Sequence, residues 1–178
     1  AKEGEMSRTP SYRTVHFSVH GLFFMDSPEL NSLAFTSRER AVKFREEDLK
    51  EYEKKNGEIK KDGFFKLGET IELGIKTDLL VMSACETSLG TEKAGEGMVG
   101  LPQGFLMGGA NNVLATLWSV DDKGTMNFMK EFYSPYFKKN LSPTKALRSA
   151  QKILSAKDSK EDKYKDPFYW SPFVVYGK

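Results

Sequence analysis

Two short apolar runs constrain the fold of this chain more than any other feature of its sequence. They are LLVMS at 79–83 and NNVLATLW at 111–118, and their apolar residues are largely continuous rather than alternating. Runs of this kind are typical of strands in a parallel sheet that is covered on both faces. TVHFSV at 14–19 and FVVYG at 173–177 add two further candidate strands. Because helical patterns separate these runs, the sequence predicts an α/β domain with a mainly parallel sheet.

The helical patterns differ in strength. Residues 142–156, SPTKALRSAQKILSA, have an apolar face at helical spacing, and Ser142 is suited to cap the amino terminus. Residues 98–110, MVGLPQGFLMGGA, indicate a poor helix, because a proline and Gly104 weaken it and the glycine pair that starts at Gly108 should stop it.

Composition and charge exclude several classes of protein. The length of 178 residues corresponds to about one domain. The 27 basic and 25 acidic residues leave a formal net charge of +2, so no strong field would attract nucleic acid. No apolar run approaches the ~20 residues that span a bilayer, and no signal peptide is expected. The single cysteine, Cys85, cannot form an internal disulfide, which fits a reducing compartment. We therefore expect a cytoplasmic domain without nucleic-acid or membrane partners.

Residues that can carry chemistry stand at the ends of two predicted strands. His20 follows 14–19, and Cys85 follows 79–83. The carboxyl ends of parallel strands meet at one edge of a sheet, where active sites gather. A histidine beside a cysteine can activate the thiolate, and the N–H groups of Gly21 and Cys85 are candidate oxyanion donors. A buried cysteine and a hydrogen-bonded histidine are equally open as structural interpretations of the same residues.

Metal and nucleotide sites have weaker support. Cys85, His16 and His20 are the only soft ligands in the chain, and their spacing is not that of a zinc site, so we expect no metal and no cofactor. GEGMVG at 95–100 matches the glycine pattern of dinucleotide sites. Such a site needs the motif directly after its strand, whereas here eleven residues follow 79–83 before it begins. Nucleotide binding is therefore the weakest of the functional hypotheses.

Several motifs together closely resemble the CHAT domain, a caspase-like cysteine peptidase module related to caspases and separase. The resemblance runs from Tyr12 to Gly177, nearly the whole chain. The segments that carry it are VHFSVHG at 15–21, DLLVMSACETSLG at 78–90, GEGMVGLPQGFLMGGANNVLATLWSVDD at 95–122, SPTKALRSAQ at 142–151 and YWSPFVVYG at 169–177. It implies a caspase-like three-layer sandwich around a mainly parallel central sheet.

The resemblance also implies roles for individual residues. His20 and Cys85 correspond to the catalytic dyad of the family. His16, on the same strand face as His20, is expected to be a supporting or core residue. The resemblance further implies that Asp121 or Asp122 shapes a pocket for a basic substrate residue. Capping of the helix that follows is an equally open interpretation for either aspartate.

The organisation of the chain is also expected to be that of a longer protein. A complete caspase-like domain would begin with a strand and a helix, and only 13 residues precede Thr14. We therefore expect residues 1–178 to be a single CHAT-like domain, the carboxyl-terminal part of a longer protein that supplies helical repeats or a sensor region. The segment 37–62 contains nine basic and eight acidic residues and is either a regulatory insert or a passive solvated loop.

The function expected from this sequence is that of a cysteine endopeptidase that cleaves a specific partner protein and is activated by the attached sensor. A role in bacterial defence would fit the family. The alternative is a catalytically silent caspase-like interaction module in a signalling or defence complex.

Overall fold

The fold is seen in a computed structural model that describes residues 12–22, 30–35, 63–83, 100–156 and 163–177. A four-stranded sheet has the order β1-β5-β6-β7. Its strands are β1 (Tyr12–Phe17), β5 (Thr77–Met82), β6 (Asn112–Thr116) and β7 (Phe173–Gly177). β1 pairs in parallel with β5 and β5 with β6, while β7 is antiparallel to β6. The predicted α/β domain with a mainly parallel sheet is therefore confirmed.

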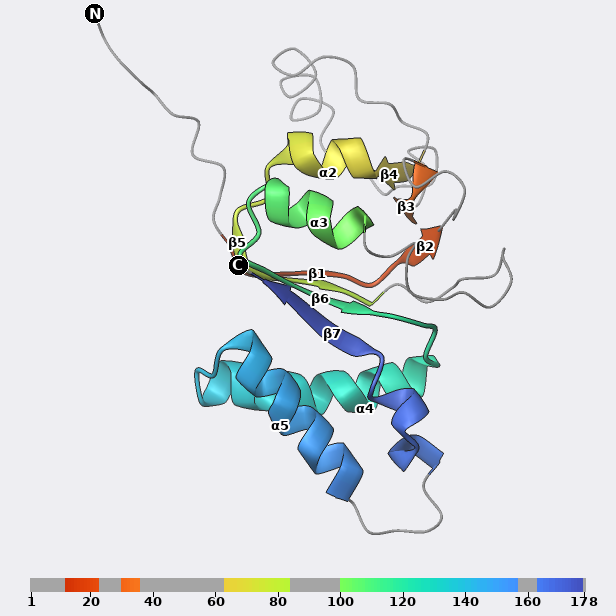
Figure 1. Cartoon of the computed structure of the whole chain (residues 1–178), viewed down its shortest axis with the longest axis vertical. Helices are drawn as coiled ribbons and strands as arrows, with labels where there is room; N and C mark the ends of the chain where they lie inside the picture. The colour runs from red at the N-terminus through yellow and green to blue at the C-terminus, as the bar shows by residue number, and fades with distance from the viewer. Residues whose placement is uncertain (1–11, 23–29, 36–62, 84–99, 157–162, 178) are drawn as a thin grey trace, which may run out of the picture.

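Helices cover both faces of this sheet, as Figure 1 shows. On one side lie α2 (Leu67–Leu73) and α3 (Gly100–Met107), and on the other lie α4 (Asp122–Tyr133) and α5 (Pro143–Ala156). A π-helical turn (Ser134–Lys138) continues α4, and two 3-10 turns (Lys163–Lys165 and Pro167–Tyr169) precede β7. The described part of the chain thus forms three layers. None of its helices is long and apolar enough to cross a membrane.

The continuous apolar runs are explained by two separate cores. Successive side chains of a strand point to opposite faces. Leu80 and Met82 pack with Phe105 of α3, whereas Leu79 and Val81 pack with aromatic and alanine side chains of α4 and α5. All four β5 side chains are buried. Burial of an aliphatic side chain of this size stabilises the fold by about 1.5–3 kcal/mol, so both helix layers are held against the same strand.

A second, three-stranded sheet was not predicted from the sequence. It consists of β2 (His20–Leu22), β3 (Ser32–Ala34) and β4 (Phe64–Lys66), all antiparallel, in the order β2-β3-β4. The predicted strand at 14–19 is therefore wrong at its end, because β1 stops at Phe17 and His20 opens β2. Three-residue strands are too short to show a period, and their pairing depends on residues far apart in the chain.

The predicted helix boundaries agree well with the structure. α5 begins one residue after Ser142, whose hydroxyl accepts a hydrogen bond from the N–H of Lys145 at 3.4 Å. α3 ends at Met107, just before Gly108 and Gly109. Gly109 has a φ of 119°, a conformation that favours glycine, and this explains the stop. The predicted insert at 37–62 lies outside the described residues.

Candidate active site

The carboxyl ends of β1 and β5 lie side by side, as the prediction of a shared sheet edge requires. The parallel register pairs Phe17 with Met82, the last residues of the two strands. Beyond them the N–H of Ser83 still donates a hydrogen bond to the carbonyl of Phe17, at 3.0 Å. His20 follows Phe17 by three residues. Cys85 follows Ser83 by two residues and lies outside the described residues, as do the contacts of its thiol.

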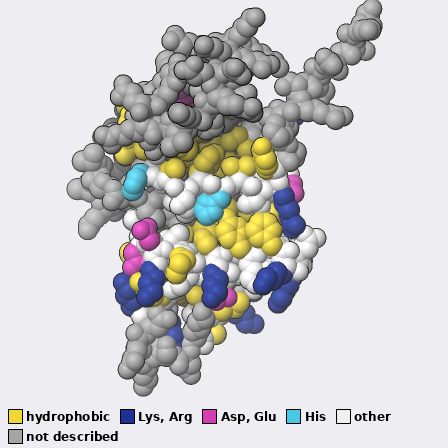
Figure 2. All heavy atoms as spheres, turned by 180° about the vertical axis from the view of Figure 1, so that it is seen from behind, with side chains coloured by type: hydrophobic (Ala, Val, Ile, Leu, Met, Phe, Trp, Pro, Cys, Tyr) yellow, Lys and Arg dark blue, Asp and Glu magenta, His cyan; other side chains and the backbone are white. Residues whose placement is uncertain are grey.

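His20 and Gly21 occupy the first two positions of β2. His20 pairs with Ala34 and its side chain is exposed, whereas Gly21 pairs with Leu33 and is buried. Figure 2 shows both histidine side chains of the chain on one face of the molecule, with hydrophobic side chains next to them. The candidate general base is therefore at the surface, and the candidate oxyanion donor next to it belongs to a regular strand.

His16 is part of a polar network that joins three elements. Its Nε2 lies 2.8 Å from the Oγ of Ser83, and its Nδ1 lies 2.8 Å from the hydroxyl of Tyr133. The Ser83 hydroxyl is also 3.5 Å from the carbonyl oxygen of Phe17. His16 retains exposed surface, yet partial burial of its ring lowers its pKa, and burial raises the pKa of Tyr133 to about 12. Both side chains are therefore neutral around pH 7.

Sequence reasoning named His16 as a supporting residue but missed its partners. Ser83 was seen only as the end of an apolar run, and Tyr133 only as part of a helix. Tyr133 is 117 residues from His16, and Ser83 is 67 residues away. A hydroxyl residue directly after a buried strand was the one available signal, because polar side chains at that position line the sheet edge where sites form.

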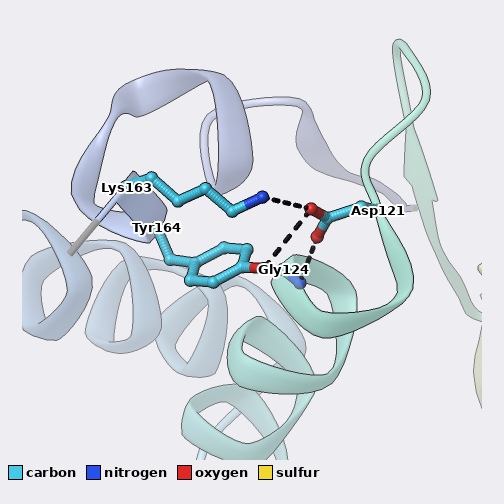
Figure 3. Close-up of polar contacts among 4 residues, drawn as sticks. All are labelled: Asp121, Gly124, Lys163 and Tyr164. Carbon is cyan, nitrogen blue, oxygen red and sulfur yellow. Dashed lines mark hydrogen bonds and ion pairs between the residues drawn. The ribbon is translucent and has the colours of Figure 1, made fainter.

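Asp121 is the amino-terminal cap of α4. Its carboxylate accepts a hydrogen bond from the N–H of Gly124 at 2.6 Å, another from the ammonium of Lys163 at 3.0 Å, and a third from the hydroxyl of Tyr164 at 3.4 Å (Figure 3). The hydrogen bond from Gly124 contributes most to lowering the pKa of Asp121, and Lys163 lowers it further. The capping interpretation is therefore confirmed for Asp121.

Asp122 differs from its neighbour. It is exposed in the first turn of α4, where a negative charge is favoured by the helix dipole. A contact with substrate remains a prediction for both aspartates. Within the part of the chain that the structure describes, no three histidine, cysteine, aspartate or glutamate side chains gather as a metal site requires.

The layered sheet and its polar edge define the class of this chain, a mixed α/β domain compatible with a caspase-like fold. Comparison with known families gives the particular family: the model of the CHAT domain matches residues 2–178. The chain therefore belongs to the CHAT domain family, whose members are related to caspase-like cysteine peptidases.

Two curated relatives are tetratricopeptide repeat protein 28 of mouse and of human. The mouse protein is 28% identical over 109 residues, which cover 61% of this chain and 4% of the mouse protein. The human protein is 26% identical over 109 residues, with the same coverage of 61% and 4%. The chain thus matches a small part of two much longer proteins.

Proposed function

We propose that this chain is a cysteine endopeptidase domain in which Cys85 is the nucleophile and His20 the general acid and base. The observation that carries the proposal is the hydrogen bond from the N–H of Ser83 to the carbonyl of Phe17, at 3.0 Å. Adjacent Cα atoms are ~3.8 Å apart, so Cys85 lies within ~8 Å of Ser83 and His20 within ~11 Å of Phe17 by covalent connection alone. These limits allow the two side chains to meet above the sheet edge.

The proposed reaction uses only groups of the chain and water. The Cys85 thiolate attacks the carbonyl carbon of the scissile bond, and the N–H groups of Gly21 and Cys85 hold the resulting oxyanion. The C–N bond then breaks, and the leaving amine takes a proton from the His20 imidazolium. A water molecule that loses a proton to His20 attacks the thioester, which releases the acid product and restores the Cys85 thiolate beside the His20 imidazolium.

The preference for a basic residue before the scissile bond is a further part of this proposal. Asp122 is its better candidate, because the Asp121 carboxylate already binds Gly124, Lys163 and Tyr164. An arginine-containing probe should therefore label the Asp122→Asn variant more slowly than the parent, while a leucine-containing probe should label both at equal rates. Equal rates with both probes would contradict a role of Asp122 in selection.

The proposed setting is a longer protein in the cytoplasm, in which helical repeats hold the peptidase inactive until a signal arrives. The names of the two relatives, both tetratricopeptide repeat proteins, support an association with such repeats. A specific partner protein would then be the substrate. A role in bacterial defence belongs to the same proposal and depends on identification of that substrate.

The decisive experiment is labelling of Cys85 by a peptide acyloxymethyl ketone, measured by mass spectrometry, in the full-length protein. We expect labelling to be faster than that of a free thiol and to fall at least ~10²-fold in the His20→Ala variant, the lower range for loss of a general acid–base. Cys85→Ala should not label, and the exposed α5 variant Lys152→Ala serves as the matched control. If Cys85 reacts only as a free thiol, with and without the repeat region, the silent interaction module is the correct function.

A further inference from the structure

We propose that Tyr133, His16 and Ser83 form one positioning unit that fixes the point where the chain leaves β5 on its way to Cys85. This inference rests on the proposed function of Cys85. It assigns to three described residues outside the dyad the task of holding the chain in place just before the nucleophile.

The three residues join the sheet to the layer formed by α4 and α5. His16 lies on β1, Ser83 directly follows β5, and Tyr133 is the last residue of α4. Thr14, two residues before His16 and therefore on the same face of β1, lies 3.5 Å from the hydroxyl of Tyr136, one turn beyond Tyr133. The His16 and Tyr133 rings are also in contact, with centroids 5.9 Å apart. The unit thus ties the end of β5 to two other elements.

The available donors and acceptors favour one direction of hydrogen bonding, from Tyr133 through His16 to Ser83. If the Tyr133 hydroxyl donates to Nδ1 of His16, then Nε2–H donates to Ser83, and the Ser83 hydroxyl donates to the carbonyl of Phe17. Every hydrogen then has an acceptor. In the opposite direction the Ser83 hydroxyl gives its hydrogen to His16, and the Phe17 carbonyl keeps only the hydrogen bond from the N–H of Ser83. The geometry therefore points to the tautomer of His16 that carries its proton on Nε2.

The engagement of both ring nitrogens separates the role of His16 from that of a general base. A base needs a free lone pair directed at the proton it removes. The Nδ1 lone pair of His16 is directed at Tyr133, and Nε2 is directed at Ser83. His16 is therefore a positioning residue. Ser83 is held twice, through its hydroxyl by His16 and through its N–H by Phe17, so its backbone has little freedom to move Cys85.

The consequence of losing this unit is a misplaced nucleophile rather than weaker binding of the probe. A displacement of about 1 Å at the reacting atoms can reduce a rate by about 10²-fold. Tyr133→Phe keeps the ring stacked on Phe137, with centroids 5.3 Å apart, and removes only the hydroxyl. We expect this variant to lower kinact for labelling of Cys85 by roughly tenfold, with an unchanged inhibitor constant, because the unit is loosened rather than removed.

Tyr136→Phe is the matched control. Tyr136 lies on the same aromatic stripe, but its hydroxyl contacts Thr14 at 3.5 Å and not the imidazole. A purely structural effect of losing a tyrosine hydroxyl should appear in both variants. The proposal requires the loss of kinact in Tyr133→Phe alone. A double variant, Tyr133→Phe with Ser83→Ala, should be no slower than the slower single variant, because members of one unit are not additive.

Nuclear magnetic resonance tests the unit without any activity. The chain contains two histidines, so His16→Gln assigns the imidazole signals. We expect the Nε2–H form of His16 at neutral pH, and amide exchange of Ser83 that is roughly tenfold faster in Tyr133→Phe than in Tyr136→Phe. A proton on Nδ1, or equal exchange in the two variants, overturns the unit.

If both resonance tests succeed and kinact is unchanged, the positioning role is overturned. Failure of the parent protein to label overturns the proposed function, while the resonance tests still decide the unit.

Discussion

Replacing Gly108 by alanine is expected to destabilise the protein by about 2–3 kcal/mol, the upper part of the range for overpacking. The new Cβ would lie 2.5 Å from the backbone oxygen of Thr70 and 3.4 Å from the Cα of Ile71, both in α2. Ordinary contacts begin at about 3.5 Å, so α2 and α3 would have to separate by roughly 1 Å. Gly108 follows the last residue of α3, so a gain in helix propensity offers little compensation.

The Gly104→Ala variant should be affected less. Its Cβ would overlap the Oγ1 of Thr70 and lie 2.6 Å from the Cδ1 of Leu67. These are side-chain atoms that can move, although the Thr70 hydroxyl would then lose its 2.7 Å hydrogen bond to the carbonyl of Leu67. Alanine also favours the helix interior over glycine by about 1 kcal/mol. We therefore expect a net loss of about 1 kcal/mol, since overpacking costs ~1–3 kcal/mol.

The control is Gly68→Ala on the opposite helix of the pair. Gly68 lies within α2, and apart from its chain neighbours and the backbone of its own helix no atom comes within 4 Å of its added Cβ. This change should stabilise the protein by up to about 1 kcal/mol. Urea unfolding followed by circular dichroism measures the free energy of unfolding of all three variants. In a separate heating experiment, each change of 1 kcal/mol should move the thermal midpoint by about 2–4 °C. If the free energies of unfolding of Gly108→Ala and Gly68→Ala differ by less than about 0.5 kcal/mol, the close packing of α2 on α3 is refuted.

Three further predictions concern the layer of α4 and α5. The stabilisation that Asp121 contributes as a charged cap should be fully present above its ordinary pKa of about 4, because its pKa is lowered in the fold, and should disappear as pH falls through that lowered value. Urea midpoints of the parent and Asp121→Asn should therefore differ at about pH 6 and converge under strong acid; a constant difference would contradict this cause. Phe128→Ala should cost about 3–5 kcal/mol, because Phe128 is fully buried and stacks on Phe173 with centroids 3.6 Å apart; a loss below about 1 kcal/mol in urea unfolding would argue against that packing. Ser142→Ala should cost about 0.5–1 kcal/mol by the same assay, since the cap hydrogen bond of 3.4 Å is long, and an unchanged midpoint would mean that it contributes nothing.

The candidate site was predictable in part. The position of His20 after one strand and of Cys85 after its parallel neighbour followed from local pattern, and the pairing of β1 with β5 agrees with it. The dyad itself stays a prediction, because Cys85 lies outside the described residues. For Asp121 the sequence allowed both a cap and a substrate contact. The cap could be predicted because its partner, Gly124, is only three residues away in the sequence. The hydrogen bond from Lys163, 42 residues away, had no local signal.

By itself, the sequence determined the class of the fold. Continuous apolar runs and helical periodicity are local properties, and they follow from which side chains must leave water on one or both faces of an element. Only the tertiary structure decided why Gly104 lies within α3 and Gly108 directly follows it: both glycines, which the sequence showed as defects of a helix, allow α2 to approach closely. It also decided which hydroxyl groups meet His16. Such contacts depend on the distance between residues far apart in the chain, and no local pattern specifies that distance.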